Sequence, residues 1–356
     1  MSYPIEVPAP SQERTSPAAL RAVAGVAAPM SPLRIPMNTF GIAFGLAGLA
    51  DTWSLATGTL GAPATVAVTL WVLTTVAWVW LVVAHTVRGR RSAERLVDQL
   101  RNSAQGPIAA LVPIVGMLIG AEVYEFLPAL GVGLMVAFIV VAALFAGWLL
   151  AQWSRGLLHI EDVHGGYFLP TVAGGFIAAT SAGTIGLHGL GLGAFAVGVF
   201  FWVVVGALIL TRITLKGQLP APLLPTLAIY IAPPAVGGTA WFSLNGGHAD
   251  PVAYSLVGLT VVLALMQIGL IPAYRRLTFS TGFWSFTFPF AAVARQAIDW
   301  LDIERPSLWQ LWAWLVVAAI TVFVAAIGIR WLFSTRPASA GPTGTNTTHD
   351  TEGRRP

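Results

Sequence analysis

The 356-residue sequence contains no cysteine, and Asp, Glu, Lys and Arg together make up only 10% of it. The lack of cysteine excludes disulfides, thiolate nucleophiles and cysteine-ligated metal or iron–sulfur centres. A soluble globular domain carries roughly a quarter charged residues, so this chain has too few to cover a water-facing surface. Hydrophobic residues make up 56% of the chain, and its mean hydropathy is +0.75. These values exclude an ordinary soluble enzyme and indicate an integral membrane protein.

Both ends of the chain differ from its apolar middle. Residues 1–33 are rich in Pro, Ala and Ser and have no basic region followed by an apolar run, so we expect a disordered tail rather than a signal peptide. Residues 334–356 are equally polar and rich in Pro and Gly, and they predict a second disordered tail. Residues 34–333 are expected to form a single transmembrane domain.

Ten apolar runs of about 20 residues follow one another between the tails, each long enough to cross a hydrocarbon core of ~30 Å. Odd-numbered runs begin at intervals of about 60 residues, which predicts five out-and-back helical hairpins. The approximate spans are 37–56, 64–87, 107–126, 129–153, 166–187, 190–211, 220–243, 252–272, 282–300 and 308–333.

The basic residues assign the two sides of the membrane. All but Arg295 and Arg305 of the 19 Lys and Arg residues fall on one side, which the positive-inside rule identifies as cytoplasmic. Both tails are therefore predicted to be cytoplasmic, and no nucleic-acid partner is expected. The many arginines beside a single lysine, Lys216, are typical of a GC-rich bacterial genome and favour the plasma (inner) membrane. The opposite side carries Asp51, Glu122, Glu125, Asp250, Asp302 and Glu304.

Interior prolines distinguish the odd spans from the even ones. A proline deep in a lipid-facing helix leaves a carbonyl unpaired where no water can satisfy it. We therefore predict an all-α membrane fold of ten helices, in which five bent odd helices form a quasi-fivefold ring around a central pore and five straight even helices face lipid. The alternative is a random scatter, since membrane helices tolerate proline. The interior prolines are Pro113, Pro170, Pro225, Pro233, Pro234 and Pro289.

Three segments together resemble a known family. FGIAFGLAGLADTW opens the first span, PTLAIYIAPPAVG lies in the seventh, and FWSFTFPFAA lies in the ninth. In these positions they resemble the TehA, slow-type anion channel and tellurite-resistance/dicarboxylate transporter family. The resemblance implies five hairpins around a pore, a homotrimer with one pore per subunit, and inorganic or small organic anions as partners besides membrane lipid. It also implies that the phenylalanine before proline in the ninth span, Phe288, gates the pore.

Helix geometry gives a separate reason to single out Phe288. At 100° per residue, Phe283, Phe286 and Phe290 share one helix face, and Phe288 lies about 200° from the latter two. We expect the three to pack against even helices, which leaves Phe288 facing the pore beside the Pro289 kink. The alternative is that Phe288 is one more packed aromatic.

Small and proline residues of the odd spans complete the predicted pore wall. A missing side chain permits either an open lumen or close helix packing. A nearly neutral wall suits fast passage of weakly hydrated monovalent anions, with backbone N–H groups at the proline breaks lowering the barrier. The residues assigned to pore lining or kinks are Gly41, Gly45, Pro113, Pro170, Gly174, Pro233 and Pro289.

Two ionisable residues are candidates at the outer mouth. Arg295 lies two turns beyond Phe288, and an intramembrane charge is a functional candidate because its exposure to lipid is costly. It could attract anions, pair with Asp299 four residues on, or snorkel to the interface. Glu122 and Glu125 end the third span, where they could repel anions if unpaired, but we expect them to pair with Arg295.

No cofactor, metal or enzymatic activity is predicted. The histidines show no metal-ligand spacing and are expected to face solvent or the interface, and no catalytic triad order, P-loop or dinucleotide fingerprint occurs. The leading hypothesis is a gated channel for small monovalent anions. A proton-linked transporter of four-carbon dicarboxylates, sulfite or tellurite-type oxyanions is the first alternative, with Glu122 as its titratable residue. A non-transporting scaffold or sensor is the second.

Overall fold

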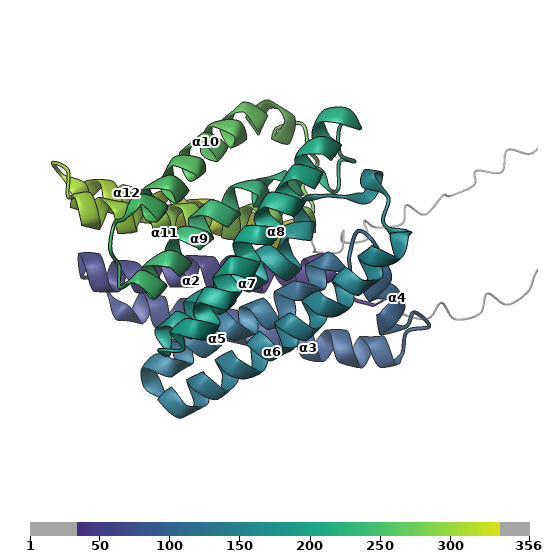
Figure 1. The fold of residues 1–356 in the computed structure, drawn as a ribbon, viewed down its shortest axis with the longest axis horizontal. Helices are drawn as coiled ribbons and strands as arrows, with labels where there is room; N and C mark the ends of the chain where they lie inside the picture. Colours follow the sequence, from purple (N-terminus) through teal and green to yellow (C-terminus); the bar gives the residue numbers. More distant parts are fainter. Residues whose placement is uncertain (1–33, 335–356) are drawn as a thin grey trace, which may run out of the picture.

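The computed structural model describes residues 34–334, so the two predicted tails lie outside the described residues except for Ser334. Within that range the chain forms helices and connecting loops without a β-strand. Seven of these helical segments are long and apolar enough to cross a membrane. The helices pack side by side as one bundle (Figure 1).

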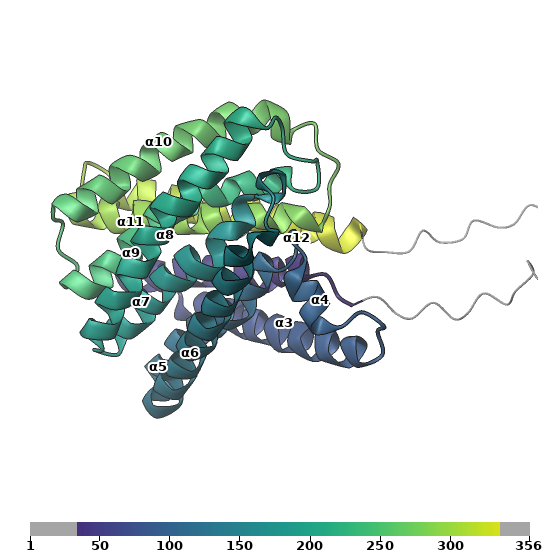
Figure 2. The same ribbon diagram turned by 45° about the vertical axis from the view of Figure 1, so that its right-hand side comes forward.

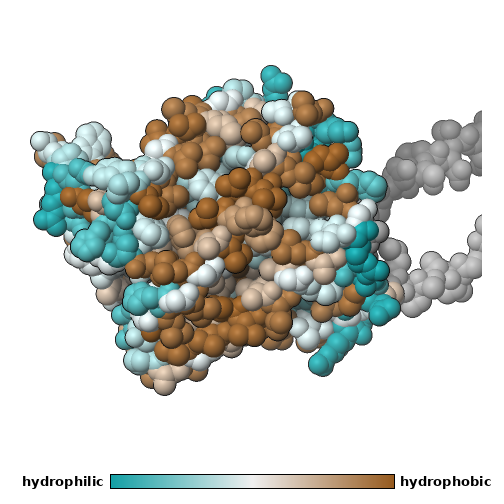
Figure 3. Space-filling view, in the orientation of Figure 1, coloured by the Kyte–Doolittle hydropathy of each residue, from teal (hydrophilic) through white to brown (hydrophobic). Residues whose placement is uncertain are grey.

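Five long helices form the outside of the bundle. Most residues of their apolar stretches are exposed. In an 18-residue apolar stretch of α10 only 17% is buried, whereas 67% of such a stretch is buried in the 224–245 segment. Figure 3 shows the result as an apolar band between two hydrophilic edges. This distribution is that of a membrane protein, because lipid rather than water surrounds the apolar side chains. The five helices are α3 (Ala64–Arg90), α6 (Pro128–Gln152), α8 (His188–Leu215), α10 (Pro251–Tyr274) and α12 (Trp309–Ser334).

Five interior segments share a different construction, because each begins with a tight 3₁₀ turn before its α-helix, followed in one segment by a wider π-helical turn. Proline occupies the first or second position of a helical element in three of the five segments, where its fixed φ and missing N–H are tolerated. The segments are η1 (Met37–Phe40) with α2 (Gly41–Leu60), η2 (Pro107–Ala110) with α5 (Leu111–Phe126), η5 (Gly165–Phe168) and η6 (Leu169–Ala173) with α7 (Gly174–Thr184), η7 (Leu224–Ile231) with α9 (Ala232–Asn245), and η8 (Thr281–Phe286) with α11 (Thr287–Glu304).

The seven apolar helical segments coincide with seven of the ten predicted spans. The other three predicted spans correspond to α2, α7 and α11. Polar residues interrupt α2 and α11, and α7 has only 11 residues after its tight turns. Membrane crossing by these three therefore stays a prediction.

Neighbouring helices satisfy backbone carbonyls around the seventh predicted span. Gln267 of α10 donates its Nε2 to the carbonyl oxygen of Leu227 at 2.9 Å, and Tyr230 donates its hydroxyl to the carbonyl of Gly206 in α8 at 2.8 Å. Both contacts are buried. Such bonds hold an irregular helix start in an environment where water is scarce.

Short elements gather at one end of the bundle. The connection after α3 contains α4 (Leu96–Arg101), and η3 (Trp153–Leu157) and η4 (Ile160–Asp162) follow α6. The first and last described segments lie at the same end as α4 (Figure 2). Both ends of the described chain are therefore on one side of the molecule.

Candidate functional site

The first cavity, called here the inner cavity, lies among the tight turns that begin the interior segments. Its volume is about 40 Å³, and every one of the five segments contributes to its wall. Its lining is mostly apolar, with only three polar side chains, those of Asn38, Thr226 and Ser285. One lining residue from each segment in chain order is Gly41, Ile108, Val172, Ile229 and Phe288.

The second cavity, called here the outer vestibule, lies further along the same interior helices. It has a volume of about 470 Å³ and is lined by α2, α5, α7, α9 and α11 together with α3. Its charged lining residues are Asp51, Glu122, Glu125 and Arg295.

Phe288 lies at the boundary between the two cavities. It lines both of them, as does Val236 of α9. The Phe288 ring stacks on the ring of Phe44 in α2, with centroids 3.6 Å apart and planes inclined by 12°. Both phenylalanines are buried. This aromatic pair, called here the Phe44–Phe288 stack, lies where the two cavities meet.

The other phenylalanines of the ninth predicted span face away from the cavities. Phe286 packs edge-on against Tyr274 at the end of α10, and Phe290 packs against Phe323 of α12. This is the division that the helical spacing predicts. Phe44, which belongs to another span, could not be identified as the stacking partner from that spacing.

The predicted pore-lining residues separate into three groups. Gly41, Pro233 and Pro289 line the inner cavity. A Cβ at Gly45 would collide with the hydroxyl of Thr287, so Gly45 permits close packing of α2 on α11, which was the alternative to an open lumen. The remaining three are buried in their helices without lining either cavity: Pro113, Pro170 and Gly174.

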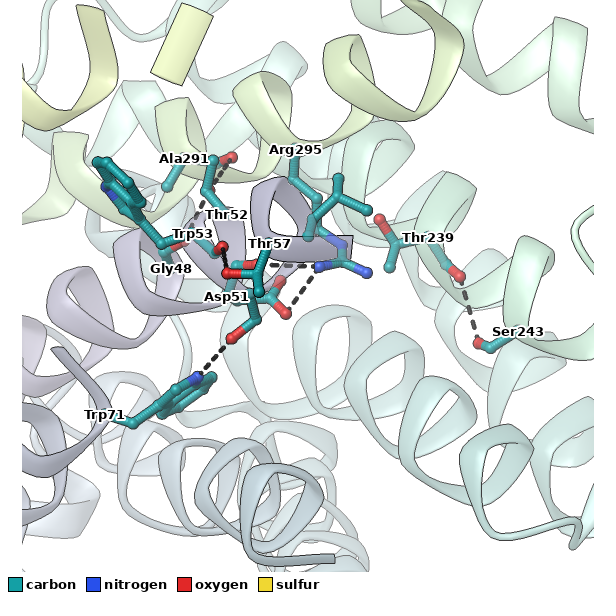
Figure 4. A network of polar contacts seen from close by, with 12 residues as sticks. Gly48, Asp51, Thr52, Trp53, Thr57, Trp71, Thr239, Ser243, Ala291 and Arg295 are labelled. Carbon is teal, nitrogen blue, oxygen red and sulfur yellow. Dashed lines mark hydrogen bonds and ion pairs between the residues drawn. The ribbon is translucent and has the colours of Figure 1, made fainter. Parts of the chain in front are cut away.

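Arg295 pairs with Asp51 rather than with the expected partners. Its Nη1 lies 2.8 Å from Asp51 Oδ1 and also donates to the Asp51 carbonyl oxygen at 3.2 Å. The two side chains point toward each other from α11 and α2 (Figure 4). The expectation that Arg295 pairs with Glu122 or Glu125 is therefore wrong.

Glu122 lies in the outer vestibule beside Ser54. The Ser54 hydroxyl in turn accepts a hydrogen bond from Trp71 Nε1 at 2.9 Å. Among residues 34–334, no Lys or Arg forms an ion pair with Glu122. The vestibule thus contains a carboxylate without a cationic partner.

Two histidines are buried, contrary to the expectation of solvent or interface exposure. His164 is fully buried and caps η5, where its Nδ1 accepts the Gly166 N–H at 3.1 Å. Burial is the main cause that lowers the pKa of His164 to about 4. His85 Nε2 lies 3.0 Å from Gln99 Oε1. The described part of the chain contains no cluster of three residues suited to hold a metal.

Apolar helices around two cavities that share an aromatic lining residue, Phe288, define a multi-pass membrane protein of the channel or transporter class. The chain belongs to the voltage-dependent anion channel (SLAC1) family, whose model matches residues 34–332. This family is made up of anion channels and transporters, not enzymes.

Curated relatives are bacterial and plant proteins. A tellurite resistance protein TehA homolog of Haemophilus influenzae is 26% identical over 267 residues, which cover 75% of this chain and 81% of that protein. The S-type anion channel SLAH3 of Arabidopsis thaliana is 24% identical over 159 residues, and these cover 44% of this chain. The guard cell S-type anion channel SLAC1 of the same plant is 25% identical over 132 residues, 37% of this chain. The matched segments span only 25% and 24% of these two plant proteins.

Proposed function

We propose that the protein is a gated channel that passes small monovalent anions and that the Phe44–Phe288 stack is its closed gate. The observation that carries this proposal is the position of Phe288 in the walls of both cavities. The stack blocks the passage between them, and rotation of one ring away from the other would join the inner cavity to the vestibule.

The inner cavity suits anions without offering them a tight binding charge. No Asp, Glu, Lys or Arg lines it, and its polar side chains are an amide and two hydroxyls. The amino ends of the five interior α-helices surround it, and a helix amino end favours negative charge. A weak and distributed attraction permits rapid passage because the ion is not held at one site.

The proposal includes an arrangement and a location. All ten spans cross the membrane as five hairpins, the interior segments form a quasi-fivefold ring around the pore, and residues 34–333 are one channel domain. The tails are cytoplasmic, the membrane is the plasma (inner) membrane, and three chains form a homotrimer. The shared side of both described chain ends supports an even number of spans.

Replacing Phe288 with Ala tests the gate. An aromatic stack contributes about 0.5–1.5 kcal/mol beyond its buried area, and a barrier lowered by 1.4 kcal/mol gives about a tenfold higher rate. Chloride and nitrate currents in planar bilayers should therefore rise about tenfold or more in Phe288→Ala. Phe200→Ala removes the same ring from the exposed face of α8, where it lines neither cavity, and should leave the currents unchanged.

Equal currents in both variants and the unmodified protein, with folding verified by thermal melting, would contradict the gate. A Phe44→Ala variant then provides a second test, because it removes the other ring of the stack. The proposal expects larger anion currents than in the unmodified protein for Phe288→Ala or for Phe44→Ala.

The unpaired Glu122 in the vestibule favours one alternative, a proton-linked anion transporter. In that case flux should saturate with substrate, follow an imposed pH gradient and disappear in Glu122→Gln. Ser54→Ala, which changes the neighbouring side chain without removing a titratable group, is the matched control. Flux that is indifferent to Glu122→Gln and to the pH gradient excludes this alternative.

A further inference from the structure

A third hollow lies on the outer surface of the bundle, behind the gate helix α11. It has a volume of about 790 Å³ and is lined by α10, η8, α11 and α12. We call it the α10–α12 groove. α10 packs on α9 and η7, whereas α12 packs on α2 and α11, so a gap remains between the two outer helices. Phe283, Phe286 and Phe290 form much of its floor.

The groove is polar at one end only. Arg275, directly after α10, and Arg330, in the last turns of α12, both line it. The Arg330 guanidinium lies over the Phe279 ring, 4.8 Å from its centroid. Neither arginine forms an ion pair with a carboxylate among the described residues. Two cations without an ion pair in the described part of the chain therefore border a slot whose remaining lining is apolar and aromatic, apart from the Gln267 amide.

We propose that the α10–α12 groove binds one anionic phospholipid, with an acyl chain on the phenylalanine floor and the phosphate at Arg275 and Arg330. The apolar slot belongs to the helices that form the exposed apolar band, so its natural occupant is dissolved in the membrane. Basic residues at the end of a membrane helix attract anionic headgroups. A second copy of the chain fits less well, because its apolar helix face would bury both unpaired guanidinium groups.

The bound acyl chain touches the back of the gate helix. Phe286 and Phe290 lie in the groove, and Phe288 between them lines both cavities from the opposite face of the same helix. Lipid in the groove supports the position of α11 and hence of the Phe44–Phe288 stack. This consequence for gating rests on the proposed function, whereas the lipid site itself does not.

Lipid binding is measured directly, so that its failure is distinguishable from a failure of anion conduction. Delipidated full-length protein is titrated with dioleoyl phosphatidylglycerol, and bound lipid is counted by native mass spectrometry. One lipid per chain should bind more tightly than dioleoyl phosphatidylcholine. Arg275→Gln/Arg330→Gln should weaken its affinity about tenfold or more, since each basic residue contributes to headgroup attraction. The control Arg88→Gln/Arg91→Gln removes two charges at the end of α3, outside the groove, and should retain binding.

A second pair of variants tests the apolar part of the groove. Ala326→Trp fills the groove from α12 and should abolish the high-affinity lipid, whereas Ala325→Trp alters the neighbouring exposed residue, which does not line it. Unchanged binding in both Arg275→Gln/Arg330→Gln and Ala326→Trp overturns the proposal. Equal affinity for phosphatidylglycerol and phosphatidylcholine also overturns it. The same spectra report the mass of the assembly, and a subunit dissociated specifically by Ala326→Trp would assign the groove to a second copy instead.

Discussion

The Asp51–Arg295 pair joins two interior helices through a contact that combines charge and burial. The side chain of Arg295 is 21% exposed and that of Asp51 35% exposed, so solvent screens the pair only partly. In this poorly hydrated place, removing Arg295 leaves the Asp51 carboxylate without its counterion, and removing Asp51 leaves Arg295 with only the charge of Asp299 nearby. Removing Asp302 from the Asp302–Arg305 pair lacks this penalty, because the remaining Arg305 side chain is 66% exposed and water solvates it.

We therefore expect Asp51→Asn to lower the free energy of unfolding in micelles by about 1–3 kcal/mol. The double variant Asp51→Asn/Arg295→Gln should lose less than the sum of the two single variants. Asp302→Asn is the control, because it leaves a well-exposed arginine, and it should cost under about 1 kcal/mol. Additive losses across the cycle would show that the two side chains act independently.

The buried His164 predicts how stability depends on pH. Its pKa is lowered from 6.5 to about 4, so between these values the unfolded chain binds a proton that the folded chain does not. The stabilisation is complete above the unfolded pKa and is lost as the pH falls toward the folded value. Going from pH ~7.5 to ~5 should cost about 2 kcal/mol at this residue.

His164→Asn retains an acceptor for the Gly166 N–H and removes the titration. The melting temperature of this variant should consequently decrease less between the two pH values than that of the unmodified protein. Parallel decreases in both proteins would show that His164 is not the source of the pH dependence.

The sequence predicts where the interior helical segments lie better than it predicts which type of helix each one forms. The sequence locates these elements well, because apolar runs and prolines are local signals: the predicted span 107–126 is the segment formed by η2 and α5. It does not reveal that residues 224–231 form a 3₁₀ helix, because that choice depends on bonds from distant residues such as Gln267. The Asp51–Arg295 contact was missed for the same reason, since 244 positions separate its partners.

Close packing of α2 on α11 predicts a severe effect at Gly45. A larger side chain there collides with Thr287, and overpacking costs about 1–3 kcal/mol. Gly45→Val should therefore lower the melting temperature in micelles. Gly58→Val lies in the same helix with open space around it and should leave the melting temperature unchanged or slightly raised. Equal effects of the two substitutions would exclude helix packing as the role of Gly45.

At the scale of the whole molecule, the absence of cysteine allows the membrane topology to be measured without prior mutagenesis. Ala93, between α3 and α4, and Ala249, between α9 and α10, are both exposed and lie in loops predicted on opposite sides. In intact cells, a membrane-impermeant maleimide should label Ala249→Cys, whereas Ala93→Cys should react only after permeabilisation. Labelling of both from the same side contradicts the ten-span topology, and the unmodified protein serves as the blank.

The position of α11 also determines from where the proposed gate can be reached. One face of this helix adjoins the two cavities and the other adjoins the α10–α12 groove, so a single helix, roughly 10 Å thick, divides the proposed ion path from the bilayer. An apolar inhibitor dissolved in the membrane thus has a lateral route to the gate that avoids the aqueous mouths. The potency of such compounds should follow their lipid–water partition coefficients, and washing the aqueous phase should reverse their block only slowly.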